Sequence, residues 1–315
     1  QPLIALFMTA IANFLGPFIF GVAVATTIGN DIVSAAHINL MVLIAACISA
    51  IFWNVLTWIL GIPSSSSHAI IGGLIGAVFM EAGFKVIMFE GIVKVLIALF
   101  ASPIIGFLVG ILIANLVYFF SWNASPKING VFKKLQIVTS IGLSLSHGTN
   151  DAQKTMGIIT LGLVISGMQS TFEVPFWVIL ICASAIGLGT AVGGWQLIKT
   201  LGSKFYKIRP VHGFASQATS AIVILTASLL GGPVSTTQVV SSAIMGVGAA
   251  ERMSKVRWGV AGEIMIAWVV TIPTTMAVGA GFYWLFDKGV PYLISIFLST
   301  QTFIKDSERR ICLHH

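Results

Sequence analysis

Long apolar runs separated by short polar breaks form the dominant pattern of this chain. The hydrocarbon core of a membrane is about 30 Å thick and takes about 20 helical residues to cross. Runs of this kind predict membrane-spanning helices. They cover Leu3–Ile28, Ile38–Leu60, Val86–Phe120, Leu135–Ser166, Pro175–Ile198, Phe214–Leu230 and Trp258–Phe286. We therefore expect an all-α polytopic membrane protein, in which the run from Val86 either tilts strongly or breaks near Pro103.

Two shorter apolar segments have a different pattern, and they repeat each other. The segments are Gly61–Phe79, "GIPSSSSHAIIGGLIGAVF", and Gly231–Gly248, "GGPVSTTQVVSSAIMGVG". At an offset of 170 positions, Gly, Pro, Ser, Gly and Glu recur in the same order. The matched pairs are Gly61 with Gly231, Pro63 with Pro233, Ser65 with Ser235, Gly76 with Gly246 and Glu81 with Glu251. This internal repeat predicts two structurally related halves.

The chemistry of these segments indicates a binding site. Proline fits the first turn of a helix, and Ser or Thr caps the free N–H groups there or offers hydroxyls to a ligand. A helix N-terminus held inside a membrane suits an anion. Paired, Gly/Pro-interrupted segments in two halves of a chain are typical of transporter binding sites. We therefore expect re-entrant half-helices over 61–79 and 231–248. The alternative is a pair of surface loops that lead into short helices.

The basic break "WNASPKINGVFKK", from Trp122 to Lys134, is the natural boundary between the halves. The predicted organisation is a first transmembrane repeat over 1–120 and a linker over 121–134. A second repeat follows over 135–286, with a short C-terminal segment over 287–315.

Composition supports a membrane protein and narrows its partners. Hydrophobic residues make up 57% of the chain and charged residues 9%, and mean hydropathy is +0.98; a soluble domain carries about 25% charge. The net charge of +7 comes from short basic clusters between apolar runs. Such clusters fit loops near anionic lipid, and we expect no nucleic-acid partner. The three cysteines, Cys47, Cys182 and Cys312, have no metal-like spacing.

A polar segment, "HGTNDAQKTMG", interrupts the run Leu135–Ser166. We interpret this run as two half-helices that break around His147–Gly148. A charged side chain at membrane depth costs a few kcal/mol, so Asp151 calls for a reason. It either pairs with Lys154, or binds a cation together with Asn150, or carries a proton. Oxygen ligands of these kinds suit a sodium-like cation.

The roles of the neighbouring basic side chains stay open from the residues alone. His147 is either a packing residue or a ligand, and Lys154 serves either an anion or Asp151. His68 follows the serine run, but its counterpart in the second half is Gln238. Imidazole chemistry is therefore not required in both halves.

Together these motifs resemble the inorganic phosphate transporter (PiT) family. "HGTNDAQKTMGIIT" is similar to the second Asn-Asp signature of that family, while "GGPVSTTQVVSSAIMGVGAAERMSKVRWGVAG" and "GIPSSSSHAIIGGLIGA" are similar to its two hairpin regions. The resemblance covers roughly Leu3 to Phe286. It implies a symporter of inorganic phosphate with Na⁺ or H⁺, built from two inverted-topology repeats, in the inner or plasma membrane.

The resemblance also assigns candidate site residues. It places Asn150 and Asp151 in the cation and phosphate site, with Na⁺ at Asp151. The hydroxyl residues that it places in or next to the site are Ser65, Ser66, Ser67, Ser235, Thr236 and Thr237. We expect no cofactor other than the coupling ion. The expected partners are phosphate, Na⁺ or H⁺ and membrane lipid, and a homodimer is open.

One departure from the family concerns the first Asn-Asp signature. At the offset of 170, the counterpart of Asn150 falls about 20 residues before Gln1. We therefore expect the first helix of repeat one to be missing from this chain. The "GND" at Gly29–Asp31 follows the first long run instead of preceding it, so we do not take it as that signature.

Three alternatives remain. Sulfate is the competing oxyanion, although phosphate retains a proton that can be donated to Asp151. A phosphate sensor would bind the ligand without transporting it. A Ser-His-Asp hydrolase needs a nucleophile, a base and an orienting acid in contact. The chain has no GxSxG sequence, and we do not expect an enzyme.

Overall fold

A computed structural model describes residues 2–62, 64–125, 127–201, 209–256, 258–289 and 291. The main helices are α1 (Pro2–Phe20), α2 (Ala23–Asn30), α3 (Leu40–Leu60), α4 (Ser66–Ala82), α5 (Phe89–Ser121), α6 (Ile128–Ile165), α7 (Phe176–Leu201), α8 (Pro210–Leu229), α9 (Thr236–Glu251) and α10 (Trp258–Trp284). Short turns η1 (Ala35–His37), η2 (Phe84–Val86), η3 (Met253–Lys255) and η4 (Leu285–Gly289) join or extend them. Within these ranges the fold is all-helical, with one isolated bridge between Val33 and Ile87.

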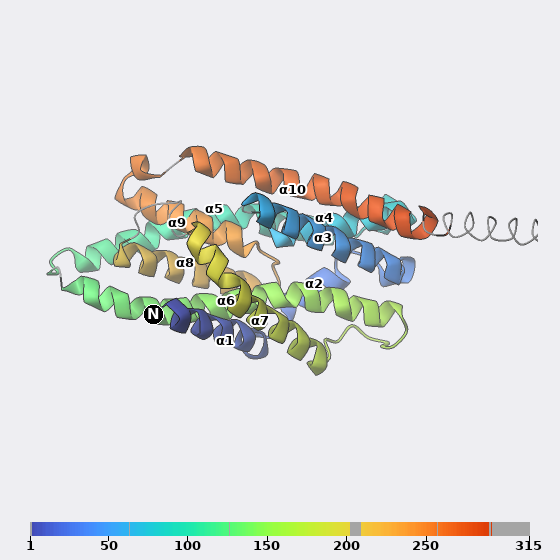
Figure 1. The fold of residues 1–315 in the computed structure, drawn as a ribbon, viewed down its shortest axis with the longest axis horizontal. Helices are drawn as coiled ribbons and strands as arrows, with labels where there is room; N and C mark the ends of the chain where they lie inside the picture. The colour runs from blue at the N-terminus through green and yellow to red at the C-terminus, as the bar shows by residue number, and fades with distance from the viewer. Residues whose placement is uncertain are drawn as a thin grey trace, which may run out of the picture.

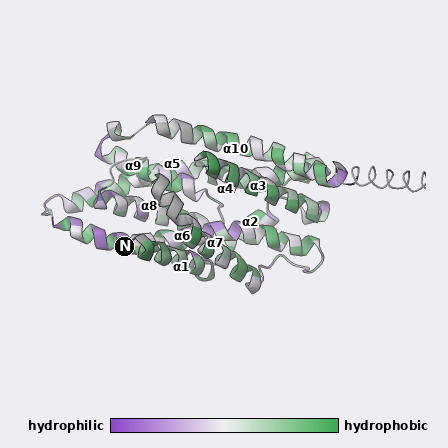
Figure 2. Ribbon diagram, in the orientation of Figure 1, coloured by the Kyte–Doolittle hydropathy of each residue, from purple (hydrophilic) through white to green (hydrophobic). Residues whose placement is uncertain are grey.

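Five of the described helices are long and apolar enough to cross a membrane. Their apolar spans are Leu3–Phe20, Leu40–Leu60, Phe89–Ser121, Phe176–Gly193 and Met265–Gly289. Much of their surface is exposed leucine, isoleucine and phenylalanine, and Figure 2 shows hydrophobic colouring along much of α1, α3 and α4. Such a surface suits lipid tails, so the chain is a membrane protein.

Two helical hairpins lie in opposite parts of the molecule. In Figure 1, α3 and α4 lie to the right and α8 and α9 to the left, while α5, α6 and α10 run along the long axis past them. The starts of α4 and α9 meet, because the Ser67 hydroxyl donates to the carbonyl oxygen of Val234 at 3.0 Å. The two hairpin tips therefore lie together inside the bundle.

The elements of the two halves correspond at the sequence offset of 170. Shifting α3, α4 and α5 by 170 positions places them on α8, α9 and α10 to within a few residues at their starts. The packing corresponds as well. The main partner of α4 is α10, from the other half, and the main partner of α9 is α5. The internal repeat of the sequence is thus also a repeat of elements and of contacts.

The break expected around His147–Gly148 is absent, and that prediction is wrong. Helix α6 runs unbroken from Ile128 to Ile165. Gly148 permits a close approach of α1, since a Cβ there would lie 2.1 Å from the Asn13 carbonyl oxygen. The polar side chains of α6 meet partners on neighbouring helices, so its backbone has no need to unwind. Helix α6 also begins inside the expected linker 121–134.

A break occurs instead in the run Leu3–Ile28, which was expected to be one span. The chain turns at Gly21, whose φ is 80°, between α1 and α2. Gln153 of α6 supports this turn. Its Oε1 accepts from the Val24 backbone N–H at 2.7 Å, and its Nε2 donates to the Gly21 carbonyl oxygen at 2.6 Å. A side chain thus satisfies backbone groups that the break frees.

Helix α5 continues through Pro103 without interruption, so the alternative of a break there is excluded. Pro63 and most of the expected segment 287–315 lie outside the described residues.

Candidate functional site

Asp151 is the centre of a buried polar cluster between α6 and the start of α9. Its Oδ1 accepts from the Lys154 ammonium at 2.5 Å. Its Oδ2 lies 3.1 Å from His147 Nε2 and accepts from the Thr236 hydroxyl at 3.1 Å. Both carboxylate oxygens therefore have protein partners. The spacing of these residues along α6 puts His147, Asp151 and Lys154 on one helix face.

Lys154 joins α6 to the hairpin tip of the second half. Its ammonium also donates to the Val234 carbonyl oxygen at 2.9 Å, and the residue is only 4% exposed. The same carbonyl accepts from Ser67 of α4. Val234 thus receives donors from both α6 and the other hairpin.

The two hairpin tips carry matching caps. Ser65 precedes α4 and accepts from the His68 backbone N–H at 3.2 Å. Ser235 precedes α9 and accepts from the Gln238 backbone N–H at 3.4 Å. The two equivalent residues touch, since the Gln238 amide nitrogen lies 3.5 Å from both ring nitrogens of His68. The two helix N-termini, which carry partial positive charge, are therefore neighbours.

Asn150 links α6 to the turn before α9. Its Nδ2 donates to the Ser228 hydroxyl at 2.8 Å and lies 3.4 Å from the Gly232 carbonyl oxygen. Its Oδ1 is buried and has no hydrogen-bond partner within the described part of the chain. An unpaired buried oxygen costs free energy, so this atom is a natural ligand for a cation or a donor.

His147 connects Asp151 to α1 and α7. Its Nδ1 lies 3.1 Å from Asn13 Oδ1, and Asn13 Nδ2 donates to the Thr190 hydroxyl oxygen at 3.0 Å. The Thr190 hydroxyl itself donates to the Ile186 carbonyl oxygen, which fixes the orientation of the Asn13 amide. Both His147 ring nitrogens then face oxygen acceptors.

The structure brings most of the predicted site residues together but divides them by exposure. Asn150, Ser65, Ser67, Ser235 and Thr236 are buried, and the contacts above use them. Ser66 and Thr237 are exposed, and their hydroxyls have no hydrogen-bond partner among the described residues. The buried hydroxyls hold the site together, whereas these two are available to a ligand.

Sequence reasoning missed four members of the cluster. They are Asn13, Gln153, Ser228 and the backbone carbonyl of Val234. The sequence could have pointed to Asn13 and Gln153, because polar amides in apolar runs need partners. No feature of the sequence marks the Val234 carbonyl as a member, since every residue has a backbone carbonyl.

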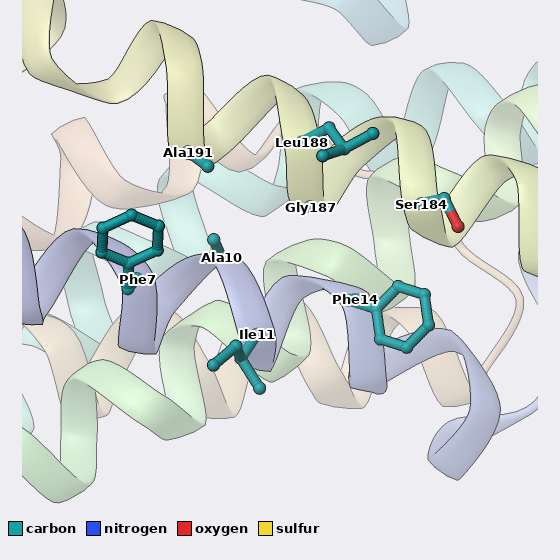
Figure 3. Close-up of a pocket in the computed structure, with 8 residues that line it drawn as sticks. All are labelled: Phe7, Ala10, Ile11, Phe14, Ser184, Gly187, Leu188 and Ala191. Atoms are coloured by element: carbon teal, nitrogen blue, oxygen red, sulfur yellow. The ribbon is translucent and has the colours of Figure 1, made fainter.

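Two largely apolar cavities lie between helices that contribute to this cluster or pack against them. One, of about 440 Å³, lies between α5 and α8 and reaches Gly232 and Val234. The other, of about 390 Å³, lies between α1 and α7. Figure 3 shows Phe7 and Phe14 of α1 on one side of it and Ala191 and Ser184 of α7 on the other.

The hydrolase alternative requires a serine hydroxyl in contact with a histidine ring, and an acidic side chain in contact with the same ring. Ser65 contacts His68 at 2.6 Å, whereas Asp151 contacts His147. These two pairs share no residue, so the structure assembles no Ser-His-Asp relay from them.

Apolar spanning helices around a buried charged cluster, with two helix starts meeting beside it, define a membrane transport protein. Comparison with known proteins identifies the group more closely. The profile described as "Phosphate transporter family" matches residues 1–279, so the chain belongs to this family.

Similar proteins agree with this membership. A probable low-affinity inorganic phosphate transporter of Rhizobium meliloti (strain 1021) is 45% identical over 289 residues, covering 91% of this chain and 86% of that protein. One of Bacillus subtilis (strain 168) is 44% identical, covering 91% and 87%. A solved structure titled "The sodium-dependent phosphate transporter" matches with a TM-score of 0.83 and 25% identity, covering 89% of each chain.

Proposed function

We propose that this protein is a secondary active symporter that moves inorganic phosphate together with a cation, Na⁺ in the first place. One observation carries the proposal. The equivalent helix starts of α4 and α9 meet inside an apolar bundle, beside the ion pair between the partly buried Asp151 and the buried Lys154. Family membership and the phosphate transporters among the relatives support the same substrate.

The charges of the cluster suit an anion. The Lys154 ammonium offsets the negative charge of Asp151, so this pair presents no net charge that would repel an anion. The N-termini of α4 and α9 add partial positive charge. The exposed hydroxyls of Ser66 and Thr237 lie in the first turns of these helices. Phosphate would bind to these hydroxyls and to nearby backbone N–H groups.

The cation would bind next to the phosphate. Asn150 Oδ1 is its first protein ligand, because it is buried and unpartnered, and Asp151 supplies charge one residue away. Because ion and anion would share the site, each offsets the charge of the other, so binding both costs less than binding either alone. That difference is the proposed coupling. The name of the similar solved structure supports Na⁺ as the ion.

We also infer two inverted repeats with re-entrant hairpins. The hairpin α3–α4 and its equivalent α8–α9 lie in opposite parts of the molecule and meet at their tips (Figure 1). Opposite membrane entry of equivalent elements is the arrangement on which alternating access by rocking depends. Sulfate, the competing oxyanion, gains no support from the relatives.

Uptake of radiolabelled phosphate into proteoliposomes tests the proposal, with Na⁺ and H⁺ gradients imposed in turn. We expect uptake to follow the Na⁺ gradient and to be lost in Asp151→Asn. Asp31→Asn is the matched control. Asp31 also pairs with a lysine, Lys94, at 3.3 Å, but both side chains of that pair are partly exposed. It should retain uptake.

Several outcomes would overturn parts of the proposal. Uptake that follows only the H⁺ gradient would show that the coupling ion is H⁺ and not Na⁺. Phosphate binding without uptake under either gradient would identify a sensor. Equal loss of phosphate uptake in Asp151→Asn and Asp31→Asn would contradict the assignment of the transport site to Asp151.

A further inference from the structure

We propose that Lys154 is a resident cation of the transport site, whose ammonium takes the place that one coupling ion would otherwise occupy at Asp151. The inference rests on the proposed cation-coupled phosphate transport and deepens it. It assigns to a side chain of this protein part of the charge compensation that mobile ions supply.

The contacts of Lys154 are those of a bound cation. Its ammonium lies 2.5 Å from Asp151 Oδ1 and 2.9 Å from the Val234 carbonyl oxygen. A carboxylate and a backbone carbonyl from a helix break are also the oxygen ligands that transporters offer to Na⁺. The side chain is 6% exposed, so water screens this charge little.

Lys154 limits where a mobile ion can bind. Oδ1 of Asp151 is taken by the ammonium, and Oδ2 faces His147 and Thr236. A metal ion would have to displace one of these donors to reach the carboxylate. The neighbouring Asn150 Oδ1 has no such competitor among the described residues.

The charge balance gives Lys154 a measurable role. With the ammonium present, the partly buried carboxylate of Asp151 has a permanent counter-ion and needs no additional one. Without it, the carboxylate loses its ammonium counter-ion and keeps only His147 and Thr236 as partners on Oδ2, which favours recruitment of a cation from solution at Oδ1. Lysine at this position should therefore lower the number of Na⁺ ions that accompany each phosphate.

A purely structural role makes a different prediction. The same two contacts also tie α6 to the tip before α9, so Lys154 could act only as a link between them. Removal of a link would lower stability and uptake together, without changing the ratio of Na⁺ to phosphate. That ratio therefore separates the two roles.

The experiment measures radiolabelled Na⁺ and phosphate fluxes in proteoliposomes for three proteins: the unsubstituted protein, called the parent below, Lys154→Met and Lys154→Arg. Methionine keeps most of the volume and removes the charge, whereas arginine keeps the charge. We expect one more Na⁺ per phosphate in Lys154→Met and the parent ratio in Lys154→Arg. Lys94→Met is the control and should keep the parent ratio, because the Lys94–Asp31 pair is half-exposed.

Thermal unfolding in detergent gives a second readout that does not need transport. Na⁺ that binds only the folded protein raises its unfolding temperature. We expect a larger Na⁺-dependent rise in Lys154→Met than in the parent, and a return to the parent rise in Asp151→Asn/Lys154→Met. An unchanged flux ratio, or for an inactive variant an unchanged Na⁺-dependent rise, would overturn the proposal.

The two proposals fail in different ways. If the parent moves no phosphate under any gradient, the proposed function is wrong. The Na⁺-dependent unfolding of Lys154→Met and of the double variant would still decide whether Lys154 substitutes for a bound cation.

Discussion

The two short helices α4 and α9 share their construction but differ in what they touch. Both follow a tight turn at a glycine with positive φ, Gly61 at 67° and Gly231 at 73°. Both begin with a capping serine and pack against a long helix of the other half. Only α9 contacts the charged cluster of α6, through Thr236. At the equivalent position of α4, Ser66 is exposed.

This comparison separates scaffold from chemistry. Features common to α4 and α9 are those that any half-helix inside a bundle needs, namely a turn, a cap and a close-packed face. We expect the features that differ to be those that meet the ligand or the ion. Variants at equivalent positions therefore test the interpretation directly, because each serves as the control for the other.

The largest difference is expected for Thr236→Val against Ser66→Ala. Valine removes the hydroxyl that donates to Asp151, and a hydrogen bond to a charged group contributes about 1.5–3 kcal/mol. We expect phosphate uptake to fall about 10- to 100-fold, by that range of energies. Ser66→Ala should raise the KM for phosphate only about 2- to 10-fold, because a neutral bond is weaker. Initial uptake rates over a range of phosphate concentrations measure both. Equal losses in Thr236→Val and Ser66→Ala would contradict the proposed difference between α9 and α4.

Next in size is a shared effect on stability. A Cβ on Gly76 would lie 2.0 Å from the Met276 carbonyl oxygen of α10, and one on Gly246 would lie 2.2 Å from the Phe107 carbonyl oxygen of α5. Alanine at either glycine must push backbones apart, at a cost of about 1–3 kcal/mol. We expect similar falls in the unfolding temperature in detergent.

Gly189→Ala is the control for this pair, since a Cβ there meets nothing within 4 Å. It should leave stability unchanged or slightly raised, because alanine favours helix. If Gly76→Ala and Gly246→Ala differ as much as either differs from Gly189→Ala, the two packing faces are not equivalent.

The caps should give a smaller and slightly unequal effect. Loss of a capping serine costs about 1 kcal/mol. Ser65 also contacts His68 Nδ1 at 2.6 Å, a bond with no counterpart at Ser235. We expect Ser65→Ala to lower stability more than Ser235→Ala, and Ser→Thr, which keeps a neutral capping hydroxyl, to lower it less than alanine at either position. A larger loss at Ser235 would show that the cap contacts are ranked wrongly.

The smallest effects are expected at the C-terminal ends, where both half-helices carry a glutamate. Glu81 accepts from the Asn39 amide and from the Tyr283 hydroxyl, which are neutral donors. Glu251 lies 3.8 Å from Arg209 and 3.3 Å from His212. Partly exposed ion pairs contribute about 0–1 kcal/mol and weaken with salt. Glu251→Gln should therefore lose stability mainly at low salt, whereas the effect of Glu81→Gln should not depend on salt.

The sequence predicted the helical elements better than their interruptions. Apolar run length located most of the spans, and the offset of 170 located the starts of the short helices α4 and α9, because their turns and caps depend on local residues. The breaks were misplaced. Gly148 was interpreted as a helix break but serves as a contact for α1, while the break at Gly21 depends on Gln153, more than a hundred positions away. A glycine looks the same in sequence in either role.

The candidate site divides in the same way. The Asn-Asp segment and the hydroxyl runs stood out, because polar groups in apolar sequence require partners. Which hydroxyls face inward did not follow, since Ser66 and Thr236 occupy equivalent positions yet differ in burial. Asn13 could be suspected only as a polar residue in an apolar run, and the Val234 carbonyl could not be suspected at all.

The sequence by itself thus determined a membrane-embedded helical protein, its internal repeat, its family resemblance and the residue types of its site. These depend on hydrophobicity, on local turn and cap chemistry and on the cost of charge in an apolar run. The tertiary structure alone decided that the two caps meet, that Lys154 joins Asp151 to Val234, and that Ser66 and Thr237 stay exposed. Those outcomes depend on distances between segments far apart in the chain, which only helix packing sets.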